Sequence, residues 1–284
     1  MVQQILLSIF VLSALLLSGC NEEPTSATEP NEYLLANGYN GGKLYDQFWA
    51  EETGFPFQDS VIIDQYPKFF RCVVCHGWDQ LGRAGGFARY FPSNTNPNAT
   101  AVNLLATAKS VDPAELFNLI KTGRVPAIRR SRESDLSTYD PVANNSIGDM
   151  MPDYSVILPD AQIWNLVKFL KTEVVDVSLL YDFALNGEYP QAARVYSNLG
   201  KDGNAVQGKA IYDNNCGSLA CHGPDGSESA GMAGTIGKYL RGMPYQCAHI
   251  FKFGFLGSDM GEEHLTDQQL KDLFKALADS TLFP

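Results

Sequence analysis

The sequence predicts an all-α protein in which one helical unit occurs twice. Three segments recur in the same order along the 284 residues, and each has the pattern of a short helix. The paired segments are 41–46 with 208–213, 115–121 with 246–252, and 158–170 with 265–277. Members of the first pair share the pattern Gly-x-x-x-Tyr-Asp. Since a chain of this length is comfortable for two domains, the repeat predicts a duplicated domain.

Local signals indicate where these helices begin and which residues they bury. Thr266 followed by Gln269 predicts a capping box at the start of the last helix. Asp112 and Pro113 give the middle helix of the first repeat a capping side chain and a proline at its first position. Apolar residues at helical spacing predict a buried stripe on the last helix of each repeat: Ile163, Leu166, Val167 and Leu170, and Leu270, Leu273, Phe274 and Leu277.

A Cys-x-x-Cys-His motif follows the first helix of the first repeat, at Cys72, Cys75 and His76. This spacing is typical of c-type haem attachment. The two thiols form thioethers to one porphyrin, and the adjacent imidazole becomes the proximal ligand of the iron. A zinc site or a redox dithiol is the alternative. Zinc would need further Cys or His at comparable spacing, and a dithiol does not explain His76.

A second motif lies at the matching place in the second repeat, at Cys216, Cys221 and His222. Four residues separate its cysteines instead of two, and the two extra residues can form a bulge. The Cys221–His222 half is intact, so the sequence predicts a second covalent haem. It is held by both thiols or, alternatively, by Cys221 alone.

The order helix, haem motif, helix, loop, helix is that of small class I cytochrome c domains, and the chain resembles two of them in tandem. The resemblance covers most of residues 41–284, and the first half is similar to a group of exported bacterial dihaem cytochromes that carry electrons. It implies two covalently bound haem c groups with their iron. We expect a first domain at 41–185 with insertions at 47–70 and 125–146, a linker at 186–206, and a second domain at 207–284.

The resemblance also implies a sixth iron ligand from a loop just before the last helix. Met151, followed by proline, fits that place in the first domain, with the adjacent Met150 as the alternative. In the second domain Met260 occupies the same register, whereas Met243 precedes the middle helix. A thioether ligand raises the reduction potential relative to a second imidazole.

Three other side chains compete for the second iron. His249 lies on the middle helix, where a polar residue is more often exposed or satisfied by a neighbour. His264 lies in an acidic stretch that we expect to be wet. Cys247 aligns with an apolar residue of the first repeat, so we expect it to be buried filler.

The N-terminus predicts export. Residues 5–17 are apolar but too few to cross a bilayer, as in the core of a signal peptide. They run into Leu17-Ser18-Gly19-Cys20, which resembles a bacterial lipobox, so we expect a signal peptide at 1–19, lipid on Cys20 and a tether at 20–40. Because no Lys or Arg precedes Lys43, an uncleaved anchor or a soluble secreted protein is the alternative.

From these features we expect the protein to lie in the periplasm, anchored to a membrane. Asn21 after the lipidated cysteine favours the outer membrane over the inner one. Lipid and haem account for five of the six cysteines, leaving Cys247 and no disulfide framework. The net charge of −11 repels nucleic acid and suits a basic redox partner, although solubility alone also favours such a surface.

Three functions fit these observations. The first is a membrane-tethered electron carrier with two low-spin haems, which moves electrons between periplasmic or membrane redox partners and transforms no substrate. The second is a haem enzyme of the dihaem peroxidase or thiosulfate dehydrogenase type, with one labile axial position. The third is a tethered subunit that serves a separate catalytic protein. A candidate methionine in each repeat favours the electron carrier.

Overall fold

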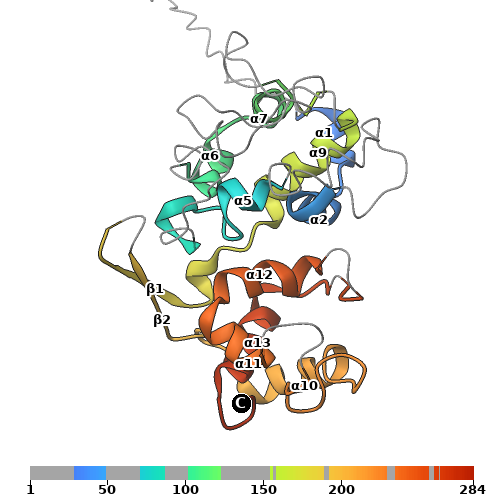
Figure 1. The fold of residues 1–284 in the computed structure, drawn as a ribbon. Coiled ribbons are helices and arrows are strands. Elements are labelled where there is room, and N and C mark those ends of the chain that lie inside the picture. The colour runs from blue at the N-terminus through green and yellow to red at the C-terminus, as the bar shows by residue number, and fades with distance from the viewer. Residues whose placement is uncertain are drawn as a thin grey trace, which may run out of the picture.

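The structure is a computed structural model that describes residues 29–48, 71–86, 102–122, 154–155, 158–188, 192–228, 234–255, 259–261 and 263–284. These parts of the chain are mostly helical, with one two-stranded sheet (Figure 1). None of the described helices is long and apolar enough to cross a membrane.

All six helices predicted from the repeats are present. In the first half they are α2 (Gly38–Gln47), α7 (Pro113–Lys121) and α9 (Asp160–Lys168), which continues into a π-helical turn, η5 (Phe169–Glu173). In the second half they are α10 (Ala205–Asn215), α12 (Pro244–Phe253) and α13 (Asp267–Ala278). The described structure adds α1 (Asn31–Leu35), α5 (Cys72–His76), α6 (Leu104–Ser110) and α11 (Ile236–Gly242), with short 3₁₀ turns at Gly82–Ala84 and Val177–Leu179.

In the first half, α2 packs closely against α9. A Cβ on Gly41 would overlap the backbone carbonyl of Asn165, so only glycine allows this approach. Asn37 caps α2 by accepting from the backbone N–H groups of Tyr39 and Asn40. Its own N–H donates to Asn165 Oδ1 at 2.7 Å, which ties the start of α2 to α9.

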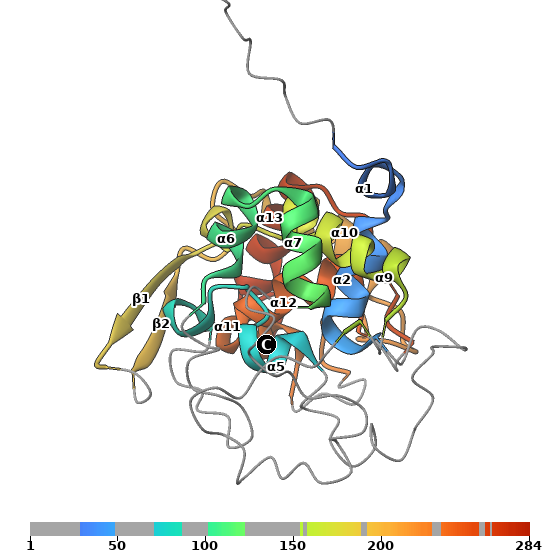
Figure 2. The same ribbon diagram turned by 90° about the horizontal axis from the view of Figure 1, so that it is seen from above.

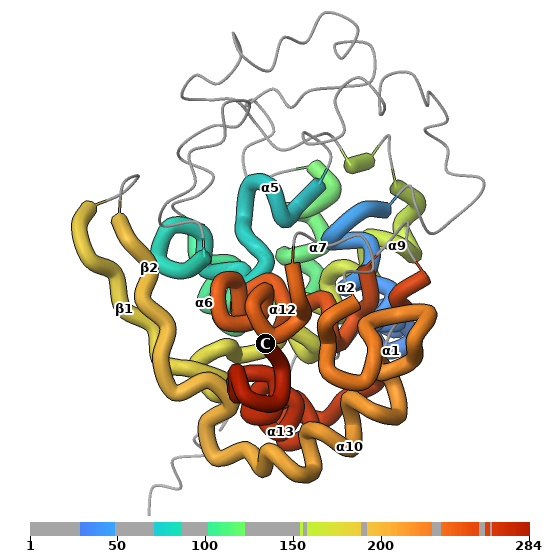
Figure 3. Tube along the Cα trace, turned by 60° about the horizontal axis from the view of Figure 1, so that its bottom comes forward, coloured from blue at the N-terminus to red at the C-terminus, as the bar shows by residue number. Residues whose placement is uncertain are grey.

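The second half repeats this arrangement with α10 and α13, which lie side by side (Figure 3). A Cβ on Gly208 would overlap the backbone carbonyl of Asp272. Asn204 caps α10, and its N–H donates to Asp272 Oδ1 at 2.7 Å. The predicted capping box is also present, since Thr266 and Gln269 satisfy each other's backbone at the start of α13.

Between the halves, β1 (Asp182–Asn186) and β2 (Ala193–Ser197) form an antiparallel hairpin that projects from the helices (Figures 1 and 2). β1 lies at the end of the predicted first domain, and β2 lies within the predicted linker. The sequence pattern did not predict these strands. Their physical basis is the alternation along β2, where half-buried Arg194 and Tyr196 alternate with exposed neighbours. The Tyr196 ring also packs against Phe183 across the pair, at 5.4 Å between centroids.

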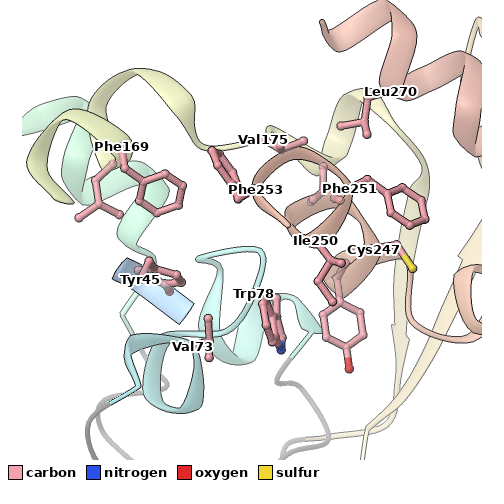
Figure 4. Close-up of a cluster of buried hydrophobic side chains, with 14 of the residues drawn as sticks. Tyr45, Val73, Trp78, Phe169, Val175, Cys247, Ile250, Phe251, Phe253 and Leu270 are labelled. Carbon is pink, nitrogen blue, oxygen red and sulfur yellow. The ribbon is translucent and has the colours of Figure 1, made fainter. Parts of the chain in front are cut away.

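The two halves share one apolar core, and α12 of the second half reaches into the first. Phe253 packs on Gly42 of α2 and meets the Phe169 ring edge-on at 5.2 Å (Figure 4). Lys252 Nζ lies 3.1 Å from the Glu173 carboxylate and also donates to the Glu173 carbonyl at 3.0 Å. The core is therefore continuous across the boundary predicted between the domains.

Candidate haem-binding sites

The first motif occupies one short helix, α5, so its two thiols and its imidazole share little more than one helical turn. Cys72 and Cys75 are half-buried, and both are free thiols. Burial raises the pKa of the Cys72 thiol to about 11 and that of the Cys75 thiol to about 12. A reactive dithiol needs a lowered pKa that stabilises the thiolate. This environment therefore disfavours the redox-dithiol alternative and leaves two neutral thiols available for covalent attachment.

His76, at the end of α5, is buried, and its Nδ1 has no hydrogen-bond partner in the part of the chain that the structure describes. Burial lowers its pKa to about 4, so the imidazole is neutral. Leaving a buried polar atom such as this Nδ1 without a hydrogen bond costs about 1–3 kcal/mol of folding stability, so its presence calls for a functional reason. A neutral imidazole is the form that ligates a metal. The residues of the first motif therefore fit covalent haem with His76 as iron ligand.

The chain turns sharply after this histidine. Gly77 has φ +82°, in the left-handed region that favours glycine, and its N–H ends the helix by donating to the Val73 carbonyl at 3.0 Å. The hydroxyl of Tyr45 on α2 donates to the Gly77 carbonyl at 2.8 Å. Asp79 Oδ1 then accepts from the Leu81 N–H at 3.2 Å.

An ion pair that the sequence did not reveal ties α2 to the start of α5. The Arg71 guanidinium donates to the carboxylate of Asp46 and, at 3.1 Å, to its backbone carbonyl. It also lies over the Trp78 ring, 5.7 Å from the centroid. Burial raises the pKa of Asp46, and Arg71 opposes that rise. Residues 46 and 71 are separated by a predicted insertion, so spacing gave no signal of this contact.

The second motif has the same components on a different backbone. Cys216 is the C-cap of α10, and the chain from there to His222 forms turns instead of a helix. Gly223 N–H donates to the Ser218 carbonyl at 2.9 Å, and His222 N–H returns to the Cys216 carbonyl at 3.2 Å. The two extra residues are thus taken up locally, and the histidine still lies beside the first cysteine.

The two cysteines of this motif differ in exposure. Cys216 is buried, which raises the pKa of its thiol to about 12, whereas Cys221 is exposed. His222 resembles His76, because it is buried and its Nδ1 has no partner among the described residues. Burial lowers the pKa of His222, and a hydrogen bond to the backbone of Glu228 opposes that shift. The donor set therefore fits a second covalent haem.

The turn after His222 matches the turn after His76. Gly223 has φ +72°, and its carbonyl accepts from the Tyr212 hydroxyl of α10 at 2.6 Å. Asp225 Oδ1 accepts from the Ser227 N–H at 3.0 Å, as Asp79 does from Leu81. The repeat thus extends to individual hydrogen bonds around the histidine.

The predicted sixth ligands are only partly covered. Met150 and Met151 lie outside the described residues, as does Cys20. Met260 is half-buried against the core, and its carbonyl accepts from the Phe255 N–H at 3.0 Å. Met243 is the N-cap of α12, so it lies ahead of the middle helix, as the register predicted.

The competing ligands lie in other environments. His249 is buried in the interface between the halves, with Nε2 3.1 Å from the Gly42 carbonyl, so it is a satisfied neighbour. His264 is exposed, with its ring 4.3 Å from that of Tyr39. Cys247 is buried, as expected of a filler residue.

A comparison with known families supports the interpretation of the first motif as a haem-binding site. Residues 67–173 match the family model for cytochrome c. This segment is a cytochrome c domain. A cytochrome c domain implies haem c, bound covalently with its iron, and supports a role in electron transfer. The match contains the first motif together with α6, α7 and α9, and it covers well under half of the chain. No curated protein and no solved structure matches the chain.

Proposed function

We propose that the chain is a dihaem c-type cytochrome, built from two tandem class I cytochrome c domains, that carries electrons between redox partners. The observation that carries the proposal is the repetition of one environment around two histidines. In both, the imidazole is buried with an unpartnered Nδ1 among the described residues, and a tyrosine of the first helix bonds the carbonyl of the following glycine.

Each motif has its own task in this proposal. Cys72 and Cys75 form the thioethers of the first haem, and His76 ligates its iron. Cys216, Cys221 and His222 do the same for the second. Bound haem c supplies an iron that accepts and releases one electron. The chain holds each imidazole neutral and buried, and the surrounding apolar core excludes water from it.

Met151 and Met260 are proposed as the ligands opposite the two histidines. Met260 lies in the loop between α12 and α13, and Met151 lies between α7 and α9. Each therefore precedes the last helix of its repeat. A thioether ligand favours the ferrous state and raises the reduction potential, which suits a carrier better than an enzyme with an open position.

We further propose that the protein is anchored in the periplasm by lipid on Cys20, with the outer membrane favoured. Several acyl chains on one residue satisfy the requirement for more than one lipid in stable anchoring. The net charge of −11 suits a basic cytochrome or membrane oxidoreductase as partner.

The intact mass of the mature protein tests the number of haems. We expect the mass of the polypeptide plus two haems, with neither haem extracted by acid and acetone. Replacing Cys216 and Cys221 together by alanine should remove one haem and leave the other. Cys247→Ala, which changes a buried thiol outside both motifs, should keep both. A wild-type protein that gains one haem only would contradict the assignment of the second motif.

A further inference from the structure

Two buried hydroxyl groups occupy equivalent places beside the two motifs. Tyr45 and Tyr212 lie on α2 and α10, and their side chains are 1% and 0% exposed. Each donates to the carbonyl of the glycine that directly follows a motif histidine, at 2.8 Å for Gly77 and 2.6 Å for Gly223. Burial raises the pKa of both phenols, so each stays protonated and able to donate.

The bonds from the two tyrosine hydroxyls are shorter than the backbone bonds that the Gly77 and Gly223 carbonyls accept. Among the described residues, these carbonyls also accept from the N–H groups of Gln80 and Gly226, at the longer distances of 3.4 and 3.3 Å. Because the glycine is bonded directly to the histidine, a fixed carbonyl also fixes the backbone from which the imidazole extends.

The tyrosines are themselves on rigid supports. Gly41 and Gly208 let α2 and α10 approach the backbones of α9 and α13, and each helix is tied there by an N–H to side-chain bond. A site is held in place best when its supporting residues lie on packed helices. The phenol therefore links the histidine turn to a closely packed helix pair of its half.

We propose that Tyr45 and Tyr212 are positioning residues, each of which orients the axial histidine of its own haem and helps to set the potential of that iron. The inference rests on the proposed dihaem function. Hydrogen bonds behind a ligand orient it and tune its metal, and hydrogen bonding around the iron is one of the protein's means of setting its potential.

The charge distribution gives the direction of the effect. The phenol turns the positive end of its O–H bond toward the negative end of the glycine carbonyl. Without the hydroxyl, the carbonyl dipole keeps only the longer bond from a backbone N–H. The site is buried and has a low dielectric, so the uncompensated dipole acts more strongly there than it would in water. A less compensated negative charge near the iron favours the ferric state, so the midpoint potential falls.

Two conservative variants test the proposal, with a third as control. Tyr45→Phe and Tyr212→Phe each remove one hydroxyl and keep the ring. Tyr245→Phe removes a buried hydroxyl that accepts from Arg194 at 2.7 Å and does not bond to a motif glycine. Haem content by mass, the two midpoint potentials and the thermal midpoint are measured for each. We expect Tyr45→Phe to lower one potential, Tyr212→Phe to lower the other, and Tyr245→Phe to lower neither.

The haem count also separates this proposal from the proposed function. Loss of a single haem, at the altered tyrosine's own motif, would support the positioning role. Loss of both haems in either variant would overturn it, because the hydroxyl would then serve the whole fold. A lower thermal midpoint with both potentials unchanged would also overturn it, leaving the tyrosines purely structural. If the wild type holds one haem, the dihaem function fails, while the Tyr45 variant still tests the first site.

Discussion

His249 on α12 lies with Nε2 3.1 Å from the carbonyl oxygen of Gly42 on α2. A carbonyl can only accept, so His249 must donate and its Nε2 carries the proton. The imidazole is enclosed by the rings of Tyr45, Trp78 and Phe253, at 4.8–5.9 Å between centroids. The second half thus places a neutral histidine against the helix and the turn that support the first haem motif.

This contact predicts acid sensitivity. Burial is the main cause that lowers the pKa of His249 to about 3; the bond to Gly42 opposes the shift, and the charges of Lys252 and Arg71 contribute to it. An unfolded histidine protonates near pH 6.5. Between these values the unfolded state binds the proton and the folded state does not, so stability falls as the pH falls. Each unit of pKa difference is worth about 1.4 kcal/mol, so the full loss is several kcal/mol.

His249→Gln isolates this effect, because glutamine can donate to Gly42 and does not titrate. Carboxylates titrate in both proteins, so the difference between the two pH profiles reports the histidine. Denaturant unfolding of the haem-loaded proteins between pH 7 and pH 4 should show the wild type losing more stability than the variant. Parallel profiles would contradict the buried, neutral state of His249.

The Lys252–Glu173 contact predicts a stabilising contribution from the interface. Lys252 is buried and bonds both the carboxylate and the carbonyl of Glu173. Lys252→Met removes both bonds, and we expect a loss of about 1–3 kcal/mol in the free energy of unfolding. The control is Lys209→Met, which breaks a more exposed i,i+4 pair with Asp213 and should cost under about 0.5 kcal/mol. Equal losses in the two variants would mean that the interface pair stabilises the fold no more than an exposed surface pair does.

The close helix crossing predicts a steep cost for a single methyl group. Gly41→Ala places a Cβ against the Asn165 carbonyl, and the contact can be relieved only by moving α2 from α9. Overpacking of this kind costs about 1–3 kcal/mol or more. Gly242 at the end of α11 has open space around its would-be Cβ, so Gly242→Ala should be neutral or stabilising by up to about 1 kcal/mol. The thermal midpoints of the two variants are compared with that of the wild type. An unchanged midpoint in Gly41→Ala would contradict the close packing of α2 on α9.

The sequence predicts helices well where they carry local signals, as with the Asp112 cap and the Thr266 capping box. It also predicts the motif histidines, because their spacing to cysteine is short. It does not predict contacts made between distant segments. The Arg71–Asp46 pair and the His249–Gly42 bond join residues 25 and 207 positions apart, and no periodicity records such pairings. It does not predict the β1–β2 hairpin either, because β1 ends the predicted first domain and the glycine- and proline-containing stretch after it is typical of a linker.

The ligand proposed for the second iron gives the last prediction. Met260 lies after α12, its side chain is half-buried against the core, and its carbonyl is held by the Phe255 N–H. Met243 caps the start of α12, so moving it to the loop before α13 would unravel that end of the helix. Met260→Ala should therefore weaken the red absorption band that marks thioether sulfur on ferric haem and should lower one midpoint potential.

Met243→Ala is the matched control, since it removes the same thioether from a position ahead of the middle helix. We expect it to leave both the band and the two potentials unchanged. If Met243→Ala abolishes half of the band and Met260→Ala does not, the register between the repeats is wrong. The second domain would then present its sixth ligand from the junction of α11 and α12. The two halves would then share the packing of their first and last helices, α2 with α9 and α10 with α13, but would differ in the loop that supplies the sixth ligand.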